Sequence, residues 1–328
     1  MPRNRRTRFA SSLPTLVLIF LCAVPATSLA EDATPPAAPS VVDLSTLTGR
    51  ILADGSSTVE PFTGEAGDRF SALTEVFVEV EISGTGGGFR RFCAGESDLQ
   101  NASRPINADE QAECEKNGVA YEVFPVAIDG ITITVNPQNT WAQCLTVEQL
   151  RRLWEPDSTV RTWSDLDPSW PNVEIELYGP GPDSGTFDYF TEVIVGEAGL
   201  TRTDYQPSEN DLDLVEGVAS QNNALGYFGF TYYEADADRL RALPIDAGAG
   251  CITPTTQSIA DGTYAPLSRE LFIYVNSADL ERPEVGEFLR FLLGESADIA
   301  RTVGYVPMPD PIYAENSDRL EAVLAARA

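Results

Sequence analysis

A strand, a loop rich in glycine and serine or threonine, and a helix follow one another three times before residue 200. The β-branched runs around 50–53, in VFVEVEI and in VEIELY lead into the loops DGSST, SGTGGG and GPGPDSGT, and each loop leads into a segment with helical periodicity. Alternation of strands with amphipathic helices is typical of α/β domains. The sequence therefore predicts an α/β fold.

The helices of these units are expected to begin at the loops and to bury one apolar face. The first helix is expected to open near Pro61, whose missing N–H costs nothing in a first turn, and the second near Phe89. Apolar residues at helical spacing are expected on the inner face of the first helix, namely Phe62, Ala66, Phe70, Leu73 and Phe77. The inner face of the third helix is expected to carry Phe187, Phe190 and Ile194.

The three loops share a chemistry that suits a negatively charged ligand. At the start of a helix, free backbone N–H groups and the positive end of the helix dipole point outward. Glycine lets the backbone approach a ligand closely, and the hydroxyl groups supply further donors. One such loop is more simply an ordinary Ser/Thr helix cap, but three of them after strands predict a cradle for an oxyanion.

The chain has no histidine, and Lys116 is its single lysine. This excludes Ser-His-Asp and Cys-His catalysis and every His-ligated metal site. No P-loop pattern is present, and Phe89 stands where a G-x-G-x-x-G motif would need its third glycine. An enzyme would have to work with carboxylates, hydroxyls and arginines alone, so a binding protein without cofactor or metal is favoured.

The N-terminus has the features of an export signal. Residues 1–30 contain four arginines near the start, an apolar stretch from Leu16 to Val24, and the small-residue pattern Ser-Leu-Ala before Glu31. The apolar stretch is too short for an ordinary membrane span, although a membrane anchor remains the alternative. We expect cleavage after Ala30, a flexible Pro/Ala tether over 31–45, and a periplasmic or extracellular location.

The charge of the chain excludes nucleic acid as a partner. Loss of the four arginines in residues 1–30 would change the net charge from −28 to −32, and such a surface does not attract phosphodiester backbones. A bound anion is still compatible with this charge. Surface charges are screened over about 8–10 Å, whereas donors about 3 Å away in a desolvated site act strongly.

Four cysteines follow the expected cleavage site: Cys93, Cys114, Cys144 and Cys251. An even number in an exported protein favours disulfides, although four cysteines allow three pairings and four buried thiols are the alternative. No C-x-x-C spacing indicates a metal or redox site.

An ordered set of motifs over about residues 46–310 resembles a known family. The set comprises GSSTVEP, SGTGGGFRRFCAGESD, ASRPI, VAIDGITITVNP, LTVEQLRRLW, GPDSGTFDYF, PLSRELFIYVN and FLRFLLGESADIARTVGYVPMP. Together they resemble the phosphate-binding proteins of high-affinity phosphate ABC transporters. The resemblance implies a monomer that closes on inorganic phosphate and delivers it to a membrane permease.

The family's fold is the class II periplasmic-binding-protein fold, with two lobes joined by two hinge crossings. The resemblance places the crossings near 124–127 and 264–267. Lobe 1 is then expected over 46–126 and 266–328, and lobe 2 over 127–265.

The resemblance also implies a set of phosphate ligands. Thr58 and the Val59 N–H match the family's first loop, with Ser57 as a neighbouring donor, and Thr85 stands where the family usually has serine. The remaining matches are in the third loop: Ser184, Gly185 and Thr186.

Two positions depart from the family pattern. Arg104 occupies the place of an aspartate that accepts the proton of hydrogen phosphate, and Pro180 occupies the place of an arginine. We expect Arg104 to be a ligand that supplies the displaced positive charge, whereas a surface salt bridge is its simpler interpretation. The proton acceptor has no clear replacement. Asp54 and Asp183, each beside a binding loop, are candidates.

The lobe boundaries implied by the resemblance favour one cysteine pairing. Cys93–Cys114 would lie within lobe 1 and Cys144–Cys251 within lobe 2, whereas both other pairings would tie the lobes together. Three other functions stay open: a receptor for sulfate or molybdate, a secreted phosphatase-like enzyme, and an adhesin or sensor that reuses the fold.

Overall fold

A computed structural model describes residues 43–182 and 184–327 of the chain. The expected signal peptide, residues 31–42 of the expected tether, and Asp183 lie outside the described residues. The described part starts with a short 3-10 helix, η1 (Leu44–Thr46), capped by the side chain of Asp43. No helix within this part is long and apolar enough to cross a membrane.

The first half of the chain contains the first two strand–loop–helix units, as predicted. Its elements are β1 (Thr48–Gly55), α1 (Glu60–Ser71), β2 (Glu75–Ile82), α2 (Thr85–Cys93), β3 (Leu99–Ala102) and α3 (Ala108–Asn117). β1 pairs in parallel with β2 on one side and with β3 on the other. The carboxyl ends of these strands therefore present their loops at one edge of the sheet.

The first helix is shorter than its apolar periodicity predicts, and the second begins earlier. α1 ends at Ser71, so Leu73 and Phe77 are not on its inner face, and they are 51% and 61% exposed. Phe77 lies on β2 and pairs with Arg50 of β1. Its strand neighbours are β-branched, and strand pairing overrides the accidental helical spacing.

The first turn of α2 packs closely against its neighbours. The helix begins at Thr85, four residues before Phe89, and three glycines follow Thr85 in its first turn. A Cβ on Gly88 would lie 2.1 Å from Gln100 Oε1 and 2.6 Å from Gly55 Cα. Only glycine fits at position 88 without displacing the neighbouring backbone.

The second half of the chain contains the third unit. Its strands are β4 (Tyr121–Val135), β5 (Leu145–Thr146), β6 (Glu176–Pro180), β7 (Gln206–Ser208), β8 (Ala224–Gly229), β9 (Arg241–Ala242), β10 (Ile245–Asp246) and β11 (Cys251–Ile252). Its helices are α4 (Val147–Trp154), α5 (Trp163–Leu166), α6 (Gly185–Phe190), the π-helix η2 (Thr191–Val195), α7 (Asp211–Ser220), α8 (Phe230–Ala235) and α9 (Thr256–Ala260). Phe187, Phe190 and Ile194 are buried as predicted, although Ile194 lies in the π-helical turn.

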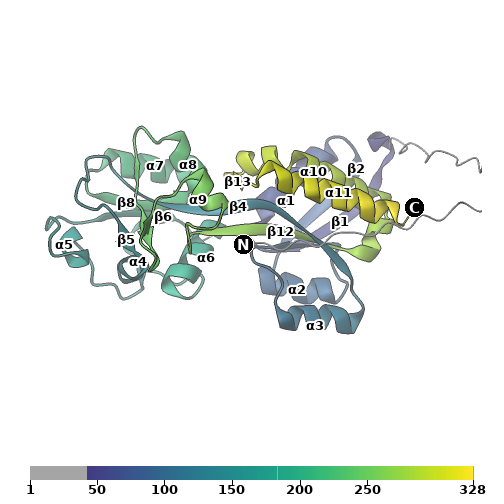
Figure 1. Cartoon of the computed structure of the whole chain (residues 1–328), viewed down its shortest axis with the longest axis horizontal. Coiled ribbons are helices and arrows are strands. Elements are labelled where there is room, and N and C mark those ends of the chain that lie inside the picture. The colour runs from purple at the N-terminus through teal and green to yellow at the C-terminus, as the bar shows by residue number, and fades with distance from the viewer. Residues whose placement is uncertain (1–42, 183, 328) are drawn as a thin grey trace, which may run out of the picture. The chain divides into compact units, whose positions relative to one another are not determined.

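The chain then returns to the first half. The returning segment comprises β12 (Ser268–Asn276), η3 (Ser277–Glu281), α10 (Pro283–Thr302), β13 (Val306–Pro307) and α11 (Asp310–Ala325). β12 lies antiparallel to the first part of β4, while the end of β4 pairs with β8. Figure 1 shows these two long strands side by side.

Side chains alternate across β12 into two apolar clusters. Leu271, Ile273 and Val275 belong to a core with α1 and α10 residues, and Phe272 and Tyr274 pack with residues of α2 and α3. Figure 1 accordingly shows α10 and α11 on one side of the strands and α2 and α3 on the other. A separate large core collects residues between 128 and 267, with Val306 and Met308. The expected residue boundaries of the lobes stay a prediction.

The structure forms the two disulfides that the sequence analysis prefers. Cys93–Cys114 joins α2 to α3. Cys144–Cys251 joins the segment just before β5 to β11. β5 and β11 lie on either side of β10 in a small separate sheet. Each bond thus connects elements that are already neighbours.

Candidate functional site

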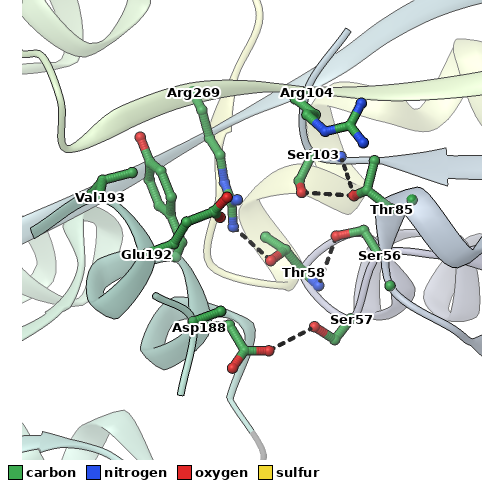
Figure 2. A pocket seen from close by; sticks show the side chains of 14 residues that line it. Ser56, Ser57, Thr58, Thr85, Ser103, Arg104, Asp188, Glu192, Val193 and Arg269 are labelled. Carbon is green, nitrogen blue, oxygen red and sulfur yellow. Dashed lines mark hydrogen bonds between the residues drawn. The ribbon is translucent and has the colours of Figure 1, made fainter. Parts of the chain in front are cut away.

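A cavity of about 480 Å³ lies where residues from distant parts of the chain meet (Figure 2). Its lining comes from the β1–α1 loop, the start of α2, the end of β3, the α6–η2 helix and β12. The lining residues are Ser56, Ser57, Thr58, Gly84, Thr85, Gly86, Ser103, Arg104, Asp188, Tyr189, Glu192, Val193, Ala198 and Arg269. Hydroxyl and guanidinium groups are prominent among them, so the cavity can donate hydrogen bonds from several sides.

The β1–α1 loop is held in place by its own hydrogen bonds. The Ser56 N–H donates to the Asn101 carbonyl at 3.0 Å, and Ser56 Oγ accepts from the Thr58 N–H at 3.2 Å. Tyr305 Oη donates to the Thr58 carbonyl at 2.5 Å. Ser57 and Thr58, both predicted ligands, therefore line the cavity from a well-supported loop.

Val59, whose N–H is also a predicted ligand, does not line this cavity. Its side chain is fully buried in the core, and its N–H donates to the Ser56 carbonyl at 3.1 Å. The N–H is already used in the turn that leads into α1.

Arg269 is the most enclosed cation of the cavity, and the sequence analysis did not identify it. Its side chain is 14% exposed, and Nη2 donates to Thr58 Oγ1 at 2.7 Å (Figure 2). The guanidinium carbon lies 3.7 Å from the centre of the Tyr189 ring, a cation–π contact. A guanidinium in this position can present its remaining N–H groups to an anion beside Thr58.

A buried carboxylate balances Arg269. Asp129 on β4 is 1% exposed, and its Oδ2 lies 3.3 Å from Arg269 Nη2. Burial raises the pKa of Asp129, while the neighbouring guanidinium acts in the opposite direction. Both residues lie within quoted motifs, VAIDGITITVNP and PLSRELFIYVN. Membership of these motifs is the one signal that could have indicated them.

Arg104 lines the same cavity but is engaged elsewhere. Its Nη1 and Nη2 donate to the two carboxylate oxygens of Glu110 at 2.9 and 2.7 Å. Glu110 also accepts from the Asn107 N–H in the capping box of α3. Although partial burial acts to raise it, bonds from Arg104 and Asn107 hold the pKa of Glu110 below its ordinary value. The structure therefore places Arg104 in the salt bridge that was its simpler interpretation.

The start of α2 and the end of β3 each contribute one hydroxyl group. Thr85 Oγ1 lies 3.0 Å from Ser103 Oγ and accepts from the Ser103 N–H at 3.3 Å (Figure 2). Thr85 is a predicted ligand. Ser103, the neighbour of Arg104 in the chain, was not predicted but lines the same cavity. Their mutual bonds keep both side chains at the cavity wall.

The third loop lines a different cavity of about 290 Å³. Ser184, Gly185 and Thr186 lie there, and Ser57 is the residue that both cavities share. The Gly185 carbonyl accepts a bond from Thr58 Oγ1 at 3.3 Å. A Cβ on Gly185 would lie 2.6 Å from Thr58 Cα. The two loops are therefore in direct contact at Thr58 and Gly185.

Asp54, one of the two proton-acceptor candidates, does not reach the cavity. Asp54 is fully buried, and its carboxylate accepts bonds from Ser83, Arg91 and the Gly55 N–H, each at 2.8 Å. It is not among the lining residues. Asp183 lies outside the described residues.

Two other carboxylates line the cavity instead, and the sequence analysis missed them. Asp188 and Glu192 are one helical turn apart on the α6–η2 helix, and Asp188 Oδ2 accepts from Ser57 Oγ at 3.4 Å. Burial raises the pKa of Asp188, and the bond from Ser57 and the charge of Arg269 oppose this shift. These two acids are four residues apart and follow a Gly-Thr pair, and this spacing could have indicated that both lie on one face of a helix.

The described residues contain no group of three or more carboxylates, cysteines or histidines that could hold a metal ion. The chemistry of the cavity is therefore that of hydrogen-bond donors, two guanidinium groups and two carboxylates.

Comparison with known proteins gives consistent matches. The model of the PBP superfamily domain matches residues 33–296. The protein SphX of Synechocystis sp. is 46% identical over 267 residues, which cover 80% of each chain. The phosphate-binding protein PstS of Staphylococcus saprophyticus is 36% identical, over 84% of this chain and 86% of the relative.

A solved structure is similar to this chain in both sequence and fold. A possible phosphate-binding protein from Planctomyces limnophilus superposes with a TM-score of 0.82 at 45% identity, over 85% of this chain and all of that chain. These matches confirm the predicted fold class, a two-lobed class II periplasmic-binding-protein fold.

Proposed function

This chain belongs to the PBP superfamily and, within it, to the family of the SphX and PstS phosphate-binding proteins, and we propose that it binds inorganic phosphate in the cavity around Arg269. The proposal includes an extracytoplasmic location and delivery of the phosphate to the permease of an ABC transporter. PstS relatives bear the name phosphate-binding protein, and the export signal expected over 1–30 supports the location.

The enclosed guanidinium of Arg269 is the observation that carries the proposal. In a desolvated site, a charge-assisted bond from arginine to an oxyanion is about twice as strong as a neutral one. Five serine and threonine residues line the same cavity, and their hydroxyl groups can complete the donor set: Ser56, Ser57, Thr58, Thr85 and Ser103. We propose Arg269, Ser57, Thr58 and Thr85 as the main ligands, with Arg104 in a secondary role.

Residues of both halves of the chain line the cavity, which suits a protein that closes on its ligand. Thr58 and Thr85 come from the first half and Asp188 and Tyr189 from the second. A ligand that bonds to both sides would stabilise the closed arrangement. Ser184, Gly185 and Thr186 would then act by packing against the first loop.

Calorimetric titration with phosphate and sulfate tests the proposal. Phosphate should bind, and at a hundredfold excess over Kd it should stabilise the fold by about 2.7 kcal/mol. Sulfate at the same concentration should stabilise it much less. Equal shifts of Tm with both anions would argue for a general oxyanion receptor, and identification of the anion in the purified protein would name the ligand directly.

Absence of enzymatic activity is part of the proposal. A chromogenic phosphate ester should show no turnover, with or without added divalent metals. Turnover that survives careful purification would favour the phosphatase alternative.

A further inference from the structure

The chain passes between two apolar cores again after α10. Tyr305, in the turn that follows α10, belongs to the core that α1 and α10 share with β12. Met308 belongs to the large core of residues between 128 and 267, and Ile312 at the start of α11 packs against that core. Leu320, further along α11, is back in the first core. Helix α11 therefore contacts both cores, and it runs alongside the long strands (Figure 1).

Strand β4 is irregular where it passes from the first core to the large one. In β12, Leu271 pairs with Ala127 of β4. The next residue of β12, Phe272, pairs with Pro125. Val126 is therefore the extra residue of a β-bulge, and Pro125 has no N–H to donate to a neighbouring strand. The pairing of the sheet is thus interrupted at the point where the sequence predicts the first hinge crossing.

Helix α11 bonds to the backbone of this irregular stretch. Three donors spaced three residues apart, and so on one face of the helix, reach three carbonyls of β4. The pairs are Tyr313 Oη with Val126 at 2.9 Å, Asn316 Nδ2 with Pro125 at 2.7 Å, and Arg319 Nη2 with Val123.

These bonds cover an edge of β4 that strands leave open. Opposite β12, the described strands β13, β8 and β9 pair with β4 only from residue 127 onward. Before residue 127, the side chains of α11 take the place of a neighbouring strand. The central donor, Asn316, is 2% exposed. The contact between α11 and the predicted hinge is therefore specific and largely shielded from water.

The bulge adjoins the enclosed cation of the larger cavity. Asp129 follows the bulge on β4, pairs with Arg269 across the ladder, and lies 3.3 Å from its Nη2. Arg269 in turn donates to Thr58 Oγ1. No described residue of α11 lines the cavity itself. A change in the bend of β4 would therefore move Arg269 relative to Thr58 without any contact between α11 and the ligand.

We propose that α11 is a splint for the hinge and that Tyr313 and Asn316 are positioning residues for phosphate binding. This inference rests on the proposed function. A hinge moves by changes of backbone angle in a few residues, and a helix that contacts both cores and bonds to those residues restrains these changes. Its bonds thus favour the arrangement in which Arg269 and the Gly185 carbonyl both meet Thr58.

The test compares phosphate affinity and the rate of phosphate release in four proteins. They are the wild type, Tyr313→Phe, Asn316→Leu and the control Tyr233→Phe. The first substitution removes one oxygen atom, and the second replaces the amide by an apolar group of similar branching. Tyr233 is also a partly buried tyrosine packed against the large core, but its hydroxyl has no hydrogen bond to another described residue.

Tyr313→Phe and Asn316→Leu should each bind phosphate about 3- to 10-fold more weakly, which is the effect of one net hydrogen bond. The loss should appear mainly as faster release in stopped-flow experiments, with little change in the association rate. Tyr233→Phe should keep the wild-type values. A purely structural role of α11 would lower Tm but leave the affinity and release of the folded protein unchanged. Thermal melts without anion check that each variant is folded at the assay temperature.

Two results would overturn the inference while leaving the proposed function intact. One is wild-type affinity and release in both folded variants, Tyr313→Phe and Asn316→Leu. The other is a loss in Tyr233→Phe as large as that in Tyr313→Phe, because the bonds to β4 would then not be its cause. A wild type that does not bind phosphate would instead overturn the proposed function, and the inference with it.

Discussion

The two cavities that share Ser57 offer opposite surroundings to loops of similar sequence. The larger one has two arginines in its lining. Among the described residues that line the smaller one there is no arginine or lysine, but there are three acids: Glu60, Glu209 and Asp211. Burial raises the pKa of Glu60, and it raises the pKa of Asp211 to about 6.

This difference shows that a Ser/Thr/Gly loop at a helix start does not determine its ligand. The loop supplies donors of similar kind in both places, and the distant side chains that fold against it set the sign of the local field. Arg269 gives the larger cavity a field that favours anions, and the acids give the smaller cavity a field that disfavours them.

The largest expected effect comes from removing the cation that distinguishes the cavities. Arg269→Ala should weaken phosphate binding by about 2–5 kcal/mol, the scale for one partner of a buried charged contact. Stability without phosphate should also fall, because Asp129 is left buried without its cation. Calorimetry of the double variant Arg269→Ala/Asp129→Asn separates the effects, since it restores stability but not affinity. Unchanged affinity in the folded double variant would remove Arg269 from the site.

Asp211 in the smaller cavity should make the stability of the fold depend on pH. The folded pKa of Asp211, about 6, lies above its ordinary value of 3.8. Its contribution to stability is therefore present in full below pH 3.8 and is lost as the pH rises through about 6. Relative to Asp211→Asn, the wild type should lose about 1–3 kcal/mol between these limits. Denaturant melts at several pH values measure this difference, and parallel curves for the two proteins would contradict it.

The contact between the loops should respond to a single methyl group. In Gly185→Ala, the new Cβ would meet the Thr58 backbone at 2.6 Å, so the contact between the two loops should be destabilised by about 1–3 kcal/mol. Phosphate affinity should fall by that amount. The control is Gly294→Ala, because a Cβ at position 294 meets no other atom. Gly196→Ala would not serve, because the backbone at Gly196 is left-handed. If Gly185→Ala binds phosphate as tightly as Gly294→Ala, the contact is not part of the bound state.

The smallest effect is expected at Arg104, the second cation of the larger cavity. Its bond to Glu110 is partly exposed, with 41% of the Arg104 side chain accessible. Arg104→Ala should change stability by no more than about 1 kcal/mol, and phosphate affinity should change far less than in Arg269→Ala. A loss of about 2–5 kcal/mol in affinity would instead restore Arg104 to the role that the sequence predicts.

Local patterns were sufficient for the elements and for part of the site. Hydroxyl and glycine residues after the strands correctly indicated that a helix follows each of the three loops, because caps and backbone approach depend on near neighbours, although α2 starts four residues before the expected Phe89. Ser57, Thr58 and Thr85 lie at the cavity for this reason. The same local patterns failed at Phe77, whose helical spacing carried no information about the strand pairing that places it on β2.

The sequence by itself determined the α/β units, the exclusion of histidine chemistry and the resemblance to a family, all of which depend on residue types and near neighbours. Only the tertiary structure decided which charges meet. Arg269 is 211 residues from Thr58 and reaches it because β12 pairs with β4. The salt bridge from Arg104 to Glu110, six residues away in the chain, is the simpler interpretation that the sequence already offered. Electrostatic interactions depend on distance and burial in space, and the folded chain alone defines both.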